Sequence, residues 1–99
     1  MIILTAKLMA KPGFEKAVED ALLAMIPNVQ KEENTLQYAL HRVVNEPSIF
    51  LYYEQYVDKK AHETHGKTVY FKELVAALDG KLACPPEETF YEIIGSIDR

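Results

Sequence analysis

The fold of this chain is indicated most clearly by residues 50–71, whose sequence is FLYYEQYVDKKAHETHGKTVYF. An alternating aromatic run from Phe50 to Tyr56 predicts a strand, because aromatic side chains fit a pleated, half-buried surface. Asp58 then predicts a tight turn and the N-cap of a helix that carries His62 and His65. A strand followed so closely by a helix indicates that the helix folds back over the strand.

The lengths of this strand and helix predict that Glu54 and His65 lie side by side. Glu54 precedes the strand end by about 10 Å, at roughly 3.3 Å per residue. His65 follows Asp58 by about 10 Å, at roughly 1.5 Å per residue. A carboxylate can orient an imidazole and raise its basicity, which leaves the other ring nitrogen free to take a proton. Because an unpaired buried carboxylate is costly, we expect Glu54 and His65 to form a catalytic acid–base pair.

Aromatic side chains around this pair are expected to hold a flat ligand. Tyrosine combines an apolar ring with a polar tip, so it suits both a half-buried strand and a ligand pocket. Each ring taken alone is therefore also consistent with a structural role, and the functional interpretation depends on their convergence with Glu54. The candidate substrate-binding residues are Tyr38, Tyr52, Tyr56, Tyr70 and Phe71.

The composition is that of one globular domain spanning residues 1–99. The chain is 48% hydrophobic and 26% charged, and 99 residues leave room for a single core. Its net charge of −4 argues against nucleic acid as a partner, because phosphate binding needs clustered Lys and Arg. The single cysteine, Cys84, cannot form an internal disulfide, and the apolar N-terminal run is too short to span a membrane. We therefore expect a cytoplasmic protein without a membrane partner.

The remaining periodicities complete a β-α-β-β-α-β order. Alternating side chains predict strands at Ile2–Met9, Leu36–Val44, Ile49–Val57 and Thr89–Ile97. An apolar period of three and four residues from Phe14 to Val29 predicts the first helix, which Pro27 either kinks or divides. The second helix is expected to break at Gly66, restart at Thr68 and end at Asp79-Gly80. This order is typical of the ferredoxin-like α+β plan with an antiparallel sheet.

Both faces of the strand Ile49–Val57 are largely apolar, although one helix layer can cover only one of them. In so short a chain, the other face is most simply covered by the sheet of a second subunit. The sequence therefore predicts a homodimer.

Other chemistries have weaker support in the sequence. His62 and His65 lie three residues apart, whereas the zinc-protease signature places its histidines four apart, and His62 is expected to face solvent. The chain contains no glycine-rich phosphate loop and no GxSxG sequence, and Cys84 has no marked activator. No metal site is predicted.

Several motifs together resemble the antibiotic biosynthesis monooxygenase superfamily of small dimeric α+β-barrel proteins. The resemblance covers nearly the whole chain, and its string around the second helix is fairly specific for the family. The matching residues are Lys11-Pro12-Gly13-Phe14-Glu15, Glu33-Asn34-Thr35-Leu36-Gln37-Tyr38, Glu46-Pro47, Tyr53-Glu54-Gln55-Tyr56, Asp58, Ala61, His65, Thr68 and Phe71. The resemblance implies a ferredoxin-like protomer whose sheet packs on that of its twin, with a pocket between sheet and helices.

The resemblance also narrows the range of expected reactions. Members of the superfamily include cofactor-free oxygenases of quinols or phenols, haem-degrading enzymes, and an isomerase of a signalling sugar phosphate. The haem-degrading branch uses asparagine, tryptophan and histidine where this chain has Ala6, Tyr56 and Val75, which argues against haem. The chain also departs from the family at Val69-Tyr70, where proline-histidine is common.

We therefore expect a cofactor-independent monooxygenase in which His65, oriented by Glu54, deprotonates a small quinol or phenol. The resulting phenolate can reduce O2 directly, so the protein would need no flavin and no metal. Two alternatives stay open. One is an isomerase of a small carbonyl compound or sugar phosphate, for which Arg42 and Lys67 are the candidate cations. The other is a non-catalytic ligand-binding or stress-response dimer.

Overall fold

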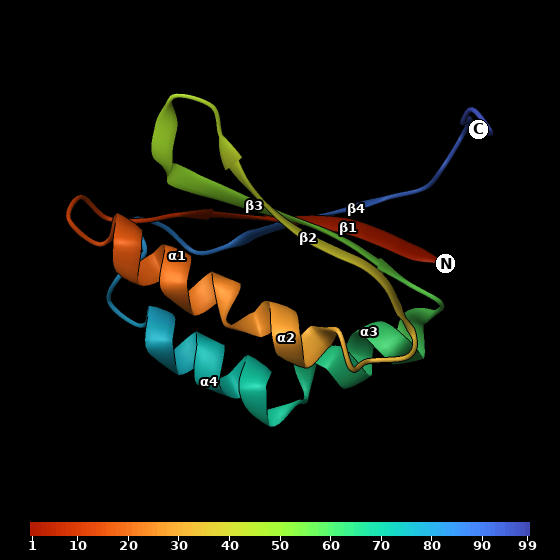
Figure 1. Cartoon of the computed structure of the whole chain (residues 1–99), viewed down its shortest axis with the longest axis horizontal. Helices are drawn as coiled ribbons and strands as arrows, with labels where there is room; N and C mark the ends of the chain where they lie inside the picture. Colours follow the sequence, from red (N-terminus) through yellow and green to blue (C-terminus); the bar gives the residue numbers. More distant parts are fainter.

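Four antiparallel strands form the sheet on which the candidate site is built. A computed structural model describes all residues, 1–99, and places every helix on one face of this sheet (Figure 1). The strands are β1 (Ile2–Met9), β2 (Thr35–Val43), β3 (Glu46–Tyr56) and β4 (Glu87–Tyr91), in the spatial order β2-β3-β1-β4. This order confirms the predicted ferredoxin-like α+β fold.

The register of the sheet determines which side chains face the helices. Leu4 of β1 lies between Glu54 of β3 and Phe90 of β4. Two residues further along β1, Ala6 lies between Tyr52 and Glu88. Because side chains alternate along a strand, these residues share the helix-facing side of the sheet.

The first helical segment is divided into α1 (Glu15–Leu23) and α2 (Met25–Val29). The division falls at Ala24, so the expectation of a separate short helix is confirmed. Pro27 lies in the first turn of α2, where a backbone N–H has no partner within the helix and its absence costs little. The buried side chains of both helices pack on the sheet; they are Val18, Leu22, Met25 and Val29.

The second helical segment breaks where the sequence predicts. Helix α3 (Lys59–Gly66) begins after Asp58, whose side chain accepts a hydrogen bond of 2.8 Å from the Ala61 N–H. Helix α4 (Val69–Leu78) begins after Thr68, whose hydroxyl accepts one of 3.2 Å from the Phe71 N–H. After α4, Gly80 has the predicted left-handed conformation, with φ of 75°.

The prediction for the last strand was wrong at both ends. Strand β4 begins at Glu87 and ends at Tyr91, whereas the alternation continues to Ile97. Tyr91 already pairs with Ile3 near the start of β1, so the residues after Tyr91 have almost no neighbouring strand left to pair with. Alternation alone cannot reveal where a partner strand ends.

No helix of the structure is both long and apolar enough to cross a membrane.

Candidate active site

A cavity of about 490 Å³ lies between the sheet and helices α3 and α4. This volume is within the range of small-molecule sites, about 300–1,000 Å³. The sheet contributes Ala6, Tyr52 and Glu54 to its wall, and the helices contribute His65 and Phe71 among others. The complete lining is Ala6, Leu8, Tyr38, Tyr52, Glu54, His62, Glu63, His65, Gly66, Phe71, Leu74, Val75, Leu78, Pro86 and Glu88.

His65 is buried at the end of α3, where Gly66 and Thr68 interrupt the helix. Only 4% of its surface is exposed. Its ring is surrounded by the rings of Tyr38, Tyr56 and Phe71, with centroid distances of 5.3, 5.5 and 5.5 Å. These rings exclude water from the imidazole on several sides.

The carboxylate that binds His65 is Glu32, not Glu54. The Nδ1 atom of His65 lies 3.1 Å from Glu32 Oε2 and 3.2 Å from Oε1. The expectation that Glu54 orients His65 is therefore wrong. Glu54 does line the same cavity, but its Oε1 atom accepts a hydrogen bond of 2.5 Å from the Tyr56 hydroxyl.

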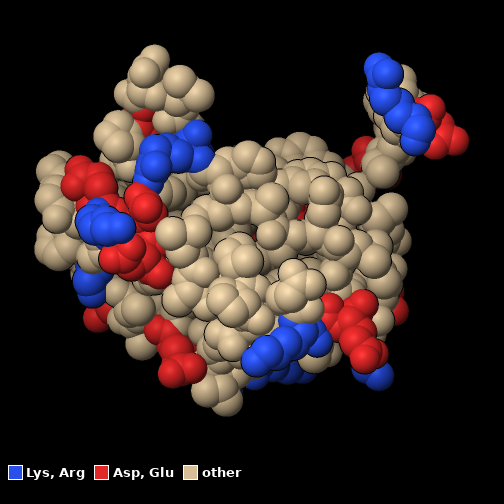
Figure 2. Space-filling view, in the orientation of Figure 1, with Lys and Arg blue, Asp and Glu red and all other residues tan.

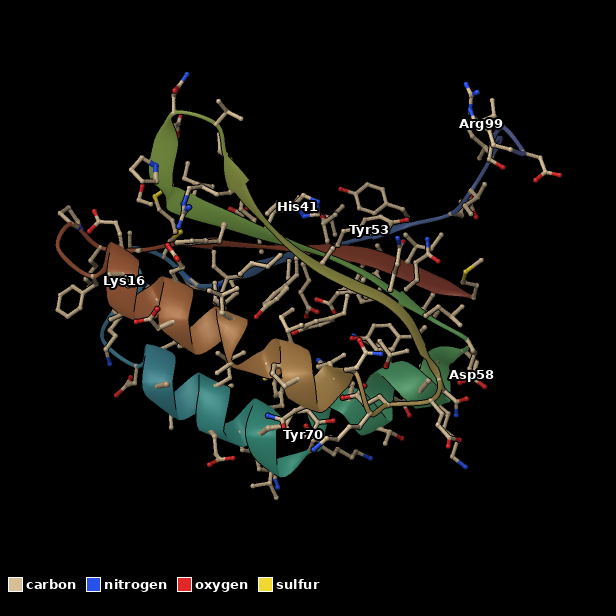
Figure 3. The ribbon with its side chains drawn as sticks, in the orientation of Figure 1. Lys16, His41, Tyr53, Asp58, Tyr70 and Arg99 are labelled. Atoms are coloured by element: carbon tan, nitrogen blue, oxygen red, sulfur yellow. The ribbon has the colours of Figure 1, made fainter.

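Glu32 lies in the loop between α2 and β2 and is fixed by two further donors. The Thr35 hydroxyl donates to Oε1 at 2.6 Å, and the Tyr70 hydroxyl donates to Oε2. Tyr70 is in the first turn of α4, on the helix side of the sheet (Figure 3). The loop before β2, the end of α3 and the start of α4 thus meet at one carboxylate.

Glu32 also determines the tautomer of His65. A carboxylate accepts hydrogen bonds, so Nδ1 carries the ring proton and Nε2 has the free lone pair. Nε2 has no hydrogen-bond partner in the protein. Every fully buried side-chain nitrogen and oxygen of the structure has a partner, so Nε2 is not fully buried. Nε2 is therefore open to the cavity, where it can accept a proton from a ligand.

Burial and the charge of Glu32 have opposite effects on the pKa of His65. Burial lowers the pKa of its imidazole below the ordinary value of 6.5, and the hydrogen bond and negative charge of Glu32 partly offset this effect. The imidazole is consequently neutral near pH 7, which is the state that a general base requires.

Glu54 is an unusually placed carboxyl group. It is 5% exposed, and burial is the main reason that its pKa is raised to about 7. The charges of Glu88 and Glu32 raise the pKa further, whereas the hydrogen bond from Tyr56 lowers it. A group with this pKa can give or take a proton near neutrality.

The predicted ring-binding residues separate into two sets. Tyr38, Tyr52 and Phe71 line the cavity. Tyr56 is fully buried outside the cavity wall, where it binds Glu54, and Tyr70 binds Glu32 and lines a smaller hollow between α1, α2 and α4. These two tyrosines bind the carboxylates of the site and do not line the 490 Å³ cavity.

Two residues of the site were missed or misplaced by the sequence analysis. His62 was expected to face solvent, but it lines the cavity, and its ring packs 5.1 Å from that of Tyr56. Glu32 was not among the candidate site residues, and nothing in the neighbouring sequence distinguishes it from Glu33. The one short-range signal is Thr35, three residues on, which binds it. The contacts with His65 and Tyr70 span 33 and 38 residues.

The predicted cations lie elsewhere. No Lys or Arg lines the cavity, whereas Glu54, Glu63 and Glu88 do. Arg42 forms an ion pair with Glu19 of α1. Charged side chains in Figure 2 gather at the ends and lower edge of the view and leave its middle largely uncharged.

A family model described as antibiotic biosynthesis monooxygenase matches residues 1–77. The chain belongs to this family. Among curated proteins, none matches the chain.

Solved structures with the same fold support this assignment. PA3566 from Pseudomonas aeruginosa is 26% identical, with a TM-score of 0.89 over 95% of this chain and 94% of its own. A proposed antibiotic biosynthesis monooxygenase from Caulobacter crescentus is 27% identical, with a TM-score of 0.86 over 95% and 90%. Rv0793 from Mycobacterium tuberculosis, at 20% identity and a TM-score of 0.89 over 98% of both chains, shares the fold. As a family member, the chain has a monooxygenase-like fold.

Proposed function

We propose that this protein is a cofactor-independent monooxygenase of a small phenol or quinol, with His65 as the general base. The observation that carries the proposal is the pairing of Glu32 with His65 Nδ1, which leaves Nε2 open to an aromatic cavity. Family membership and the monooxygenase-like fold support the reaction class.

The base has a defined task in this reaction. Nε2 would take the hydroxyl proton of the ligand, and the resulting phenolate would pass an electron to O2. Tyr38, Tyr52 and Phe71 would contact the ligand ring from the cavity wall, while the apolar part of the wall limits access of bulk water. The chain's own contribution is thus proton removal, orientation and exclusion of water.

The composition of the wall favours this activity over isomerisation of a sugar phosphate. A phosphate group is normally recognised by Arg, Lys or clustered backbone N–H groups. The cavity has three Glu side chains and no Lys or Arg, so it favours a ligand without negative charge.

A homodimer is the second part of the proposal. The face of the sheet away from the helices is not covered by any element of the chain, and it includes His41 and Tyr53 (Figure 3). Along β3, Ile49, Leu51 and Tyr53 are only half-buried there. The sheet of a second copy would bury this face. A cytoplasmic location, with Cys84 reduced, belongs to the same proposal.

Oxygen uptake by metal-free protein tests the activity directly. Protein would be mixed with a panel of hydroquinones and naphthols in an oxygen electrode. A positioned general base contributes about 10²–10⁴-fold in rate, so His65→Ala should lower uptake by a factor in that range. Thr64→Ala, the exposed neighbour on α3, is the matched control and should keep the rate.

The possible outcomes separate the monooxygenase from the two alternatives. Uptake that depends on His65 supports the monooxygenase. Silence across the panel supports an isomerase or a non-catalytic binding protein, because neither would consume oxygen with these compounds. Uptake that His65→Ala leaves unchanged removes His65 from the mechanism.

A further inference from the structure

The acid–base site contains one ionisable group that proton removal by His65 does not use. Glu54 is 95% buried by the surrounding protein, yet it lines the cavity. The Tyr56 hydroxyl donates a hydrogen bond to Oε1 of Glu54, and Oε2 has no hydrogen-bond partner in the protein. Because no enclosed oxygen of the structure lacks a partner, Oε2 is open to the cavity. The carboxyl group therefore has one atom held by the protein and one atom presented to a ligand.

We propose that Glu54 is a second catalytic residue, which protonates the peroxide formed on the ligand and then takes the proton from the oxygenated carbon. The inference rests on the proposed monooxygenase function. It assigns Glu54 a role different from that of orienting His65, for which Glu32 is responsible.

The first half of the reaction produces a peroxide. His65 takes the hydroxyl proton, and the phenolate gives one electron to O2, which forms superoxide and a ligand radical. These two combine, so a new carbon–oxygen bond forms at a ring carbon that carries hydrogen. Glu54, as the neutral acid, then gives its proton to the outer oxygen of the peroxide anion and becomes a carboxylate.

The second half of the reaction restores both residues. The Glu54 carboxylate takes the proton from the oxygenated carbon, the O–O bond breaks, and a carbonyl group and hydroxide are formed. Hydroxide takes the proton from the His65 imidazolium and becomes water. The net reaction of a phenol with O2 gives a quinone and water, so every proton and electron is accounted for without a further reductant.

The surroundings of Glu54 suit a group that must alternate between acid and base. Tyr56 on its own strand donates to it, and Glu88 on β4 and Glu32 before β2 add negative charge that favours the acid form. The other ionisable groups on the cavity wall are Tyr38, Tyr52, His62, Glu63 and His65. A pKa of about 7 lets Glu54 hold a proton in the resting protein and accept one later.

The test uses 1-naphthol, which the reaction would convert to 1,4-naphthoquinone and water. Wild-type protein should form one quinone for each O2 consumed and release no hydrogen peroxide. Glu54→Gln keeps the shape of the side chain but cannot supply a proton. It should slow quinone formation by about 10²-fold or more, and superoxide that escapes should appear as hydrogen peroxide. Glu87→Gln, the same change on the outer face of β4, is the control and should match wild type.

A second variant tests the proton on Glu54 without removing the carboxyl group. Tyr56→Phe deletes a hydrogen bond that lowers the Glu54 pKa, so the pKa should rise. The pH above which the rate of quinone formation falls should move upward. In the Glu54→Gln background, Tyr56→Phe should leave this pH unchanged, because no carboxyl group is left to titrate. If Tyr56 had only a structural role, its replacement would have the same effect in both backgrounds.

The outcomes separate this inference from the proposed function. Wild-type protein that fails to consume oxygen with any phenol overturns the monooxygenase and the acid role together. The role of Glu54 alone is overturned by two results together. Oxygen consumption depends on His65, and Glu54→Gln still forms one quinone for each O2 consumed at an unchanged rate.

Discussion

His65 Nδ1 lies 3.1 Å from Glu32 Oε2, and this contact joins a helix to a loop 33 residues earlier in the chain. The contact fixes the tautomer of the imidazole and leaves Nε2 open to the cavity. Glu32 is itself held by Thr35 and Tyr70, so the position of the His65 ring depends on groups that do not line the cavity.

Glu32→Gln should weaken the base while keeping the side chain in place. The negative charge of Glu32 raises the His65 pKa, so its loss should lower that pKa further. Oxygen uptake should fall by about 10²-fold, as expected when the group that orients a catalytic histidine loses its charge. NMR titration of the His65 ring measures the pKa change, and Glu33→Gln provides an exposed control. A His65 pKa that rises in Glu32→Gln would contradict the assignment.

The rate should depend on pH as a bell-shaped curve. It should rise with pH as His65 becomes neutral, with a midpoint below 6.5, because burial lowers the pKa of this group. It should fall again near pH 7, where Glu54 loses the proton that the peroxide needs. A profile of kcat/KM against pH measures both limbs. A rising limb without a falling one would show that Glu54 acts in no proton-requiring step.

Glu54 should also make the folded protein less stable as pH rises. Below pH 4.5 the folded and unfolded chains both hold the proton. Between about 4.5 and about 7 only the folded chain keeps it, so the free energy of unfolding falls across this interval, by up to about 3 kcal/mol. Urea unfolding of wild type and Glu54→Gln at several pH values isolates the effect. A difference between the two proteins that is constant with pH would contradict the raised pKa.

Leu51→Lys should separate the proposed dimer. Leu51 is half-buried on the outer face of β3, and a charge there would have to be desolvated in a sheet-to-sheet interface. Sedimentation equilibrium should give twice the chain mass of 11.3 kDa for wild type and the chain mass for the variant. Val69→Lys, at an apolar residue that is 72% exposed on α4, should remain a dimer. A monomeric wild-type protein would remove the dimer from the proposal.

Most of the fold could be predicted from the sequence because its determinants are local. Asp58, Thr68 and Gly80 act within a few residues of their own positions, and the structure places each as expected. The end of β4 could not be predicted, because it depends on where β1 begins. The identity of the partner of His65 could not be predicted either. Strand and helix lengths bring Glu54 into the correct cavity, but they do not reveal that a loop carboxylate reaches the ring first.

The position of Glu32 behind the imidazole has a consequence for how this scaffold can diversify. The carboxylate borders a separate polar recess with Thr35 and Asp58, and it contributes nothing to the aromatic cavity. Side chains that select a ligand by its shape can therefore be exchanged without changing the contacts of Glu32 that orient the His65 ring. The shape of the cavity and the orientation of His65 by Glu32 therefore depend on different side chains, and each can be engineered while the other is kept.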